Sequence, residues 1–200
     1  MNFMNIKKTE ASKISVATDM GKLRNGLKTF FIKYDGQPFV FQTPWMKMPF
    51  DPDEHENDRR SYTLCCDDDS FKSGLKIFDA EVKRVAKEER PLQFFKKSEV
   101  SEEFFEMNYT PAVRNGGEYS DKFKIKSDRG TTFYDRDGTK SEMTPTIKRG
   151  SELRAIVECK YVWLNAGKLG ATFVAKQIQH RSNDLGDELL IVDLVDEDED

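Results

Sequence analysis

Two long segments near the end of the chain constrain its fold more than any other feature. Residues 152–164 (ELRAIVECKYVWL) alternate in polarity, and residues 170–181 (GATFVAKQIQHR) follow after a loop that contains Gly167. A period of two predicts extended strands, and the glycine-bearing loop between them predicts a hairpin. Strict alternation would put six side chains of the first strand on one face: Leu153, Ala155, Val157, Cys159, Tyr161 and Trp163.

The rest of the chain adds short strands and one clear helix. Residues 27–35 and 37–43 are rich in aromatic and β-branched residues and flank Asp35-Gly36, a pair typical of a hairpin turn. Residues 73–90 have apolar side chains at steps of three and four, which predicts an amphipathic helix that ends before Pro91. Further strands are expected at 59–66, 121–127 and 131–135, the last before a turn at Asp137-Gly138, and a helical turn at 101–107.

Short strands at this spacing indicate a mainly β fold, either a sandwich or a small barrel. A barrel that is interrupted by one helix midway has the outline of an OB-fold. We therefore predict an OB-fold-like antiparallel barrel with an inserted α-helix, while other all-β architectures stay open.

The charge of the chain is divided unevenly along its length. The formal net charge is -4, but residues 184–200 contain nine acidic residues and no lysine or arginine. Residues 1–183 therefore have 32 basic and 27 acidic residues, a net charge of +5. We expect residues 184–200 to form a disordered acidic C-terminal tail on a mildly basic domain. Within that domain, acids cluster at 51–58 and 67–69.

A basic surface with aromatic side chains is what single-stranded nucleic acid requires, because cations bind its phosphates and rings stack on its bases. Aromatic candidates here are Trp45, Tyr161, Trp163 and Phe173, together with Phe39 and Phe41. Alternate strand positions favour the core for Phe39, Phe41 and Phe173, whereas Trp163 is open between core and surface. Cationic candidates are Lys33, Lys47, Arg59, Arg60, Lys122, Lys124, Lys126, Lys160, Lys168 and Lys176.

Enzymatic and metal-binding interpretations are weaker. Residues 135–139 (DRDGT) match a phosphatase motif, but no buried parallel strand precedes them and no alternation of strands and helices follows. Residues 51–58 have the acid density of a calcium loop but Glu56 in place of the required glycine. Cys65, Cys66 and Cys159 lack zinc-ligand spacing. We expect no catalytic residue, no metal and no cofactor.

Residues 41–50 (FQTPWMKMPF) and 150–179 together resemble proteins of large nucleocytoplasmic DNA viruses. The late hairpin with its acidic tail also resembles the single-stranded DNA-binding proteins of short-tailed coliphages. The resemblance implies an OB-fold protein that coats single-stranded DNA in viral replication, recombination or repair. It draws attention to Gln42, Thr43, Pro44, Trp163, Gly167 and Gly170. The coliphage tails end in an aromatic residue, whereas this chain ends in Asp200.

We therefore predict a domain over 1–183 that binds single-stranded DNA without sequence preference, and a tail over 184–200. The tail would compete with DNA and contact replication proteins through Asp193, Asp196, Glu197, Asp198, Glu199 and Asp200. The alternative is a non-catalytic scaffold of the virion or replication complex that binds protein. A homodimer through an exposed strand edge is open. Without a membrane-spanning run or a signal-peptide pattern, we expect the chain inside a host cell, in cytoplasm or nucleus, or packaged in the virion.

Overall fold

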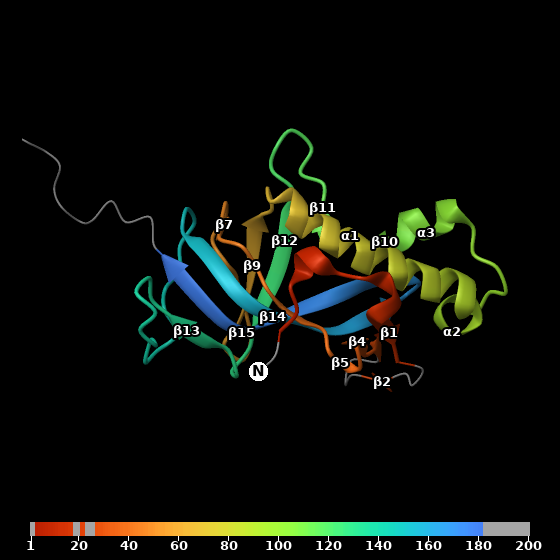
Figure 1. The fold of residues 1–200 in the computed structure, drawn as a ribbon, viewed down its shortest axis with the longest axis horizontal. Coiled ribbons are helices and arrows are strands. Elements are labelled where there is room, and N and C mark those ends of the chain that lie inside the picture. Colours follow the sequence, from red (N-terminus) through yellow and green to blue (C-terminus); the bar gives the residue numbers. More distant parts are fainter. Residues whose placement is uncertain (1–2, 18–20, 23–26, 182–200) are drawn as a thin grey trace, which may run out of the picture.

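The structure is a computed structural model that describes residues 3–17, 21–22 and 27–181. The predicted acidic tail, 184–200, lies outside the described residues. Two strands of 14 residues each, β14 (Glu152–Asn165) and β15 (Lys168–Arg181), form the predicted hairpin and run through the whole molecule (Figure 1). Ala166 and Gly167 make the turn with positive φ, a conformation that glycine adopts without steric cost.

The other strands pair along both sides of this hairpin. The main sheet has the order β2-β3-β14-β15-β12-β9-β8, and β7 also contacts β9, so the sheet curls back on itself. Most pairings are antiparallel, as expected, but β15 also pairs in parallel with β10, β12 and β13. The remaining strands of this sheet are β2 (Gly21–Lys22), β3 (Lys28–Phe30), β6 (Val40–Gln42), β7 (Met46–Lys47), β8 (Asp53–His55), β9 (Arg59–Cys65), β10 (Tyr109–Thr110), β11 (Val113–Arg114), β12 (Lys122–Ser127) and β13 (Thr132–Tyr134).

A small second sheet contains the first predicted hairpin. Its strands are β1 (Ile14–Val16), β4 (Ile32–Tyr34) and β5 (Gln37–Pro38). Asp35 and Gly36 connect β4 to β5 with φ of 50° and 74°, which confirms the predicted turn. The expected strand over 27–35 is divided into β3 and β4 at Phe31, whose side chain is exposed.

The predicted inserted helix is α1 (Asp69–Arg84), which begins four residues earlier than expected. The Asp68 carboxylate accepts a hydrogen bond from the Phe71 backbone N–H (2.9 Å) and thereby caps the helix. A π-helical turn, Val85–Glu89, continues α1, and two short helices follow, α2 (Pro91–Phe95) and α3 (Glu102–Asn108). Two 3₁₀ turns, Ile6–Lys8 and Ala11–Lys13, precede β1. None of the helices in the described residues is long and apolar enough to cross a membrane.

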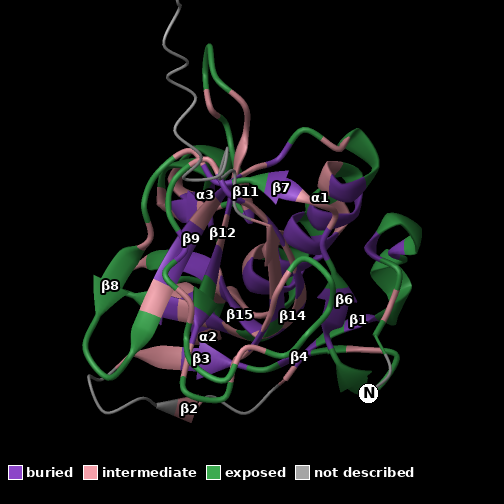
Figure 2. Ribbon diagram, turned by 90° about the vertical axis from the view of Figure 1, so that its left-hand side faces the viewer, coloured by how far each residue is buried: buried purple, intermediate pink, exposed green. Residues whose placement is uncertain are grey.

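Packed aromatic rings between α1 and the curved sheet form a large part of the core. Figure 2 marks the buried segments of the helix and of the strands in purple. Phe71 and Phe78 of α1 contact rings from the strands at centroid distances between 5.1 and 5.9 Å: Phe39, Phe41, Phe123 and Phe173. Burial of a phenylalanine side chain contributes about 1.5–3 kcal/mol, so these rings are a major source of stability. Helix α1 closes one side of the barrel, and the outer faces of β14 and β15 point away from it.

Candidate nucleic-acid interface

Two β-bulges decide which side chains of the long hairpin face outward. Ile156 pairs with Gln177 but Val157 pairs with Ala175, which leaves Lys176 as an extra residue on β15. On β14, Lys160 is the extra residue, between the pairs Cys159–Phe173 and Tyr161–Thr172. An extra residue reverses the alternation beyond it.

The bulge at Lys160 corrects the predicted faces of β14. Leu153, Ala155, Val157 and Cys159 are buried as expected, but beyond the bulge the buried residues are Val162 and Leu164. Tyr161 and Trp163 are only half-buried and lie on the opposite face from the one predicted. The Trp163 ring covers Gly170, where a Cβ atom would come within 2.6 Å of the ring. Trp163 thus packs on the outside of the sheet and not in the core.

A groove of about 930 Å³ lies on this outer face, between the β8–β9 hairpin, the end of β12 and the middle of β14 and β15. It contains five of the residues that we predicted from the sequence: Arg59, Arg60, Lys126, Lys160 and Tyr161. Other residues of the groove were not predicted from the sequence, among them His55, Ser127, Thr172 and Val174. Thr172 and Val174 flank Phe173 on β15. Because side chains alternate along a strand, assigning Phe173 to the core would have placed both neighbours on the outer face.

The cations of the groove differ in how they are paired. Lys126 forms no ion pair in the part of the chain that the structure describes. Its pKa is lowered, first by burial and then by the neighbouring charges of Lys124 and Arg59. A cation beside other cations attracts an anion strongly, because an anion relieves their mutual repulsion.

Acids from the β8–β9 hairpin and from the loop after β12 pair with other cations at the groove. Asp53 binds Lys124 at 2.7 Å, and this contact lowers the pKa of the Asp53 carboxyl. Glu54 lies 3.4 Å from Arg60. Asp128 lies 3.4 Å from Lys160. The acidic cluster at 51–58 is therefore part of the basic face and reduces its charge.

The other predicted residues are distributed as follows. Lys122 lies on β12 with its Nζ 3.6 Å from the Cys65 sulfur, and Lys176 pairs with Glu158 at 2.5 Å. Lys33, Lys47 and Lys168 are exposed and do not line the groove.

Two aromatic predictions change in the structure. Phe173 is 3% exposed and packs against Phe41, Phe78 and Phe123, so our prediction that it contacts nucleic acid is wrong. Trp45 is half-buried, and its ring contacts the guanidinium groups of Arg154 and Arg181 at 4.9 and 4.3 Å.

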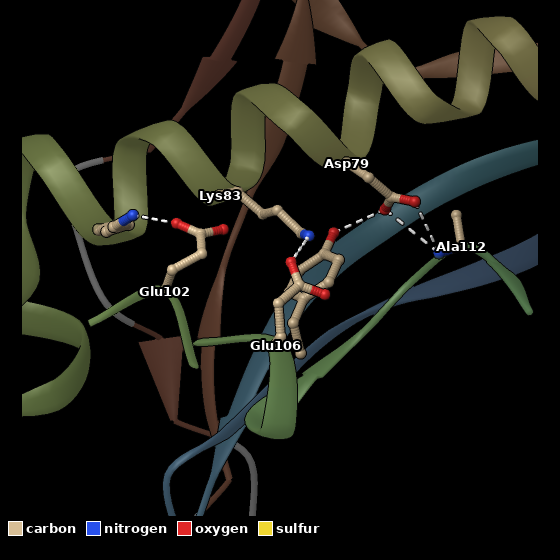
Figure 3. Close-up of polar contacts among 7 residues, drawn as sticks. Asp79, Lys83, Glu102, Glu106 and Ala112 are labelled. Atoms are coloured by element: carbon tan, nitrogen blue, oxygen red, sulfur yellow. Dashed lines mark hydrogen bonds and ion pairs between the residues drawn. The ribbon is translucent and has the colours of Figure 1, made fainter. Parts of the chain in front are cut away.

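A buried carboxyl group joins α1 to the strands below it (Figure 3). Asp79 accepts hydrogen bonds from the Tyr109 hydroxyl (2.6 Å) and from the Ala112 backbone N–H (3.0 and 3.2 Å). Burial raises its pKa to about 6. Ion pairs of Lys83 with Glu106 and of Lys87 with Glu102 hold α3 against the same helix. The hydrogen-bond partners of Asp79 are the Tyr109 hydroxyl and the Ala112 backbone N–H. We therefore assign to Asp79 the structural role of holding α1 on the barrel.

No family model matches this chain, and no curated protein matches its sequence. Solved structures do match. The single-stranded DNA-binding protein gp2.5 encoded by bacteriophage T7 is 16% identical with a TM-score of 0.50, covering 80% of this chain and 97% of that one. The single-stranded DNA-binding protein from bacteriophage Enc34 is 11% identical with a TM-score of 0.50, covering 88% and 96%. At these identities the likeness concerns the fold, and the expected OB-fold-like barrel with an inserted helix is confirmed.

Proposed function

We propose that this chain binds single-stranded DNA without sequence preference, along the groove between β8, β12, β14 and β15. The observation that carries the proposal is Lys126, which has no ion pair among the described residues and lines the same groove as Tyr161. The shared fold with two phage single-stranded DNA-binding proteins supports it.

The chemistry of the groove suits a strand that is bound by its backbone. Lys126 and Arg59 provide charge for phosphates, and the half-exposed Tyr161 ring provides a surface on which a base can stack. Stacking contributes roughly 1–3 kcal/mol per base and accepts any base, because every base has a π-face. His55 Nε2 and Ser61 Oγ share a hydrogen bond of 2.8 Å, which holds the His55 ring in place. The groove therefore favours binding over catalysis.

The biological role rests on the sequence resemblance. We propose that the chain coats single-stranded DNA during replication, recombination or repair of a large nucleocytoplasmic DNA virus. The acidic residues of 184–200 would compete with DNA for the groove and then contact replication proteins. Removal of 184–200 should strengthen binding of oligo-dT and make it more sensitive to salt, because the vacated groove then releases more counterions. Unchanged affinity after truncation would exclude a competing tail.

The test of the proposed function is a titration of fluorescently labelled dT12, followed by anisotropy at low and high salt. We expect saturable binding that weakens as salt increases, and several-fold weaker binding by Lys126→Gln. Lys76→Gln is the matched control, because Lys76 lies exposed on α1, outside the groove. If the full chain does not bind dT12 at low salt, the proposal is wrong and the protein-binding scaffold is favoured.

A further inference from the structure

A second cavity lies farther along the same outer face and is not explained by the groove. It has a volume of about 520 Å³ and lies at the end of β15. Strand β13 pairs with this end of β15 (Figure 1). Volumes of about 300–1,000 Å³ are typical of small-ligand sites. None of the predicted nucleic-acid-binding residues lines this cavity.

Two arginines of the cavity are available for an anion. Arg154 of β14 and Arg136 of the loop after β13 both line it, and neither forms an ion pair within 3–17, 21–22 and 27–181. Asp137 also lines the cavity, but its carboxylate accepts a hydrogen bond from the Thr139 backbone N–H (2.8 Å), which lowers its pKa and holds it within its own turn. Unpaired guanidinium groups match the geometry of phosphate oxygens.

One glutamine contacts the Arg154 side chain and the backbone at Arg136. Arg154 Nε donates to Gln179 Oε1 at 2.7 Å, and Gln179 Nε2 donates to the backbone carbonyls of Asp135 and Arg136 at 3.0 Å each. The Trp45 ring lies 4.9 Å from the Arg154 guanidinium and supports it from the side. Since these contacts fix the Arg154 side chain before a ligand arrives, little conformational entropy is lost on binding.

The floor of the cavity suits a flat ring with polar edges. Ile156 pairs with Gln42 on β6 and with Gln177 on β15, so an apolar side chain lies between two exposed amides on three adjacent strands. Phe3, 51% exposed, stands at the rim. A nucleobase would cover Ile156 and stack on Phe3, while either amide can bind its polar edge.

The groove and the cavity share one surface. Tyr161 of the groove and Arg154 of the cavity are seven positions apart on β14, a separation of roughly 20 Å at the usual rise of a strand. We infer that the cavity is a second nucleotide subsite for the same DNA strand. It binds a phosphate at Arg136 and Arg154 and a base between Phe3 and Ile156. This inference rests on the proposed function of the groove.

The test compares two oligonucleotide lengths on the full chain. The cavity variant is Phe3→Ala with Arg136→Gln, and its control is Leu92→Ala with Lys76→Gln, which removes an exposed apolar side chain and one charge from the helices. Labelled dT12 can reach from groove to cavity, whereas dT3 is too short. We expect the cavity variant to bind dT12 five- to tenfold more weakly and dT3 within twofold of the unaltered chain.

The outcomes separate the inference from the proposed function. If Lys126→Gln weakens dT12 binding and the cavity variant does not, the subsite is wrong and the groove stands. If no oligonucleotide binds the unaltered chain, both are wrong. A second measurement avoids dependence on variants: dT12 carrying 5-iodouracil should photocrosslink to Phe3 or Tyr134 peptides. Crosslinks at the groove alone would overturn the subsite.

Discussion

The groove and the cavity are built on the same two strands and differ in how their cations are held. In the groove, acids pair with Arg60 and Lys160, and Lys126 is left without an ion pair among the described residues. Outside the groove lining, Asp53 pairs with Lys124. In the cavity, Arg154 is held by a neutral amide and by the Trp45 ring. The two regions of this face therefore differ in kind. In the groove, neighbouring acids compete with a ligand for the cations, whereas in the cavity the arginine side chain is already held in place.

The local register of the hairpin separates the two regions. The cavity includes the regular pair Arg154–Gln179 and ends beside the bulge at Lys176, next to the pair Ile156–Gln177, whereas the groove contains the bulge at Lys160. A bulge locally increases strand twist and redirects side chains. The extra residue at Lys160 is what brings Tyr161 to the outer face.

Removal of this bulge should have the strongest effect. Deletion of Lys160 would turn Val162 and Leu164 outward and Tyr161 and Trp163 inward. Exposing the two aliphatic side chains should lower the free energy of unfolding by about 3–6 kcal/mol in a urea titration. Lys160→Ala keeps the number of residues in β14 and should lower the free energy of unfolding by less than about 0.5 kcal/mol. Equal stability of the deletion and the unaltered chain would show that the bulge does not determine the face.

Protonation of Asp79, which holds α1 on the barrel, should change the free energy of unfolding with pH. The pKa of Asp79 is about 6 in the folded chain, above its ordinary 3.8, so protonation favours folding. Its contribution, about 3 kcal/mol, is complete below pH 3.8 and is lost as pH rises through 6. The unfolding free energy of the unaltered chain minus that of Asp79→Asn should therefore decrease as the pH rises from 4 to 6.5. Carboxyl groups in ion pairs elsewhere have the opposite pH dependence. Their contribution is the same in both chains and cancels in the difference. A constant difference across that range would contradict the raised pKa.

Charge reversal in the groove should weaken DNA binding. Lys126→Glu should weaken dT12 binding by about tenfold or more, because it places an acid beside Arg59 and Tyr161. The slope of log affinity against log salt should become shallower by about 0.7 for each phosphate that the groove no longer neutralises. Lys76→Glu changes the net charge equally, far from the groove, and should have a small effect. If the two variants weaken binding equally, overall charge and not the groove governs affinity.

The weakest effect is expected where an acid pairs with a cation near the groove, Lys124, whose charge acts on Lys126. Asp53→Asn removes the partner of Lys124 and should strengthen dT12 binding about two- to threefold at low salt. Asp69→Asn, at the exposed start of α1, is the matched loss of one acid and should change affinity less. Weaker binding by Asp53→Asn would mean that Asp53 positions Lys124 for DNA instead of competing with it.

Much of the fold could be predicted from local pattern. The long hairpin, the Asp35-Gly36 turn and helix α1 were predicted correctly, because alternation, turn residues and helical periodicity are local properties. Five predicted residues meet in one groove, because the strands that carry the cations converge when the sheet curls and the bulge at Lys160 brings Tyr161 to the same face. Arg154 was missed, although an arginine alternating with Leu153 and Ala155 was a visible signal.

Local sequence was sufficient to specify the strand pair, the inserted helix and the separation of an acidic end from a basic domain. That Tyr161 and Trp163 face outward follows from the tertiary structure alone, because a bulge depends on the register with a partner strand. The same holds for Phe173, which completes an aromatic core, and for Asp53, which pairs with Lys124, 71 positions away. Contacts between distant segments depend on how strands meet in space, and no local pattern records that geometry.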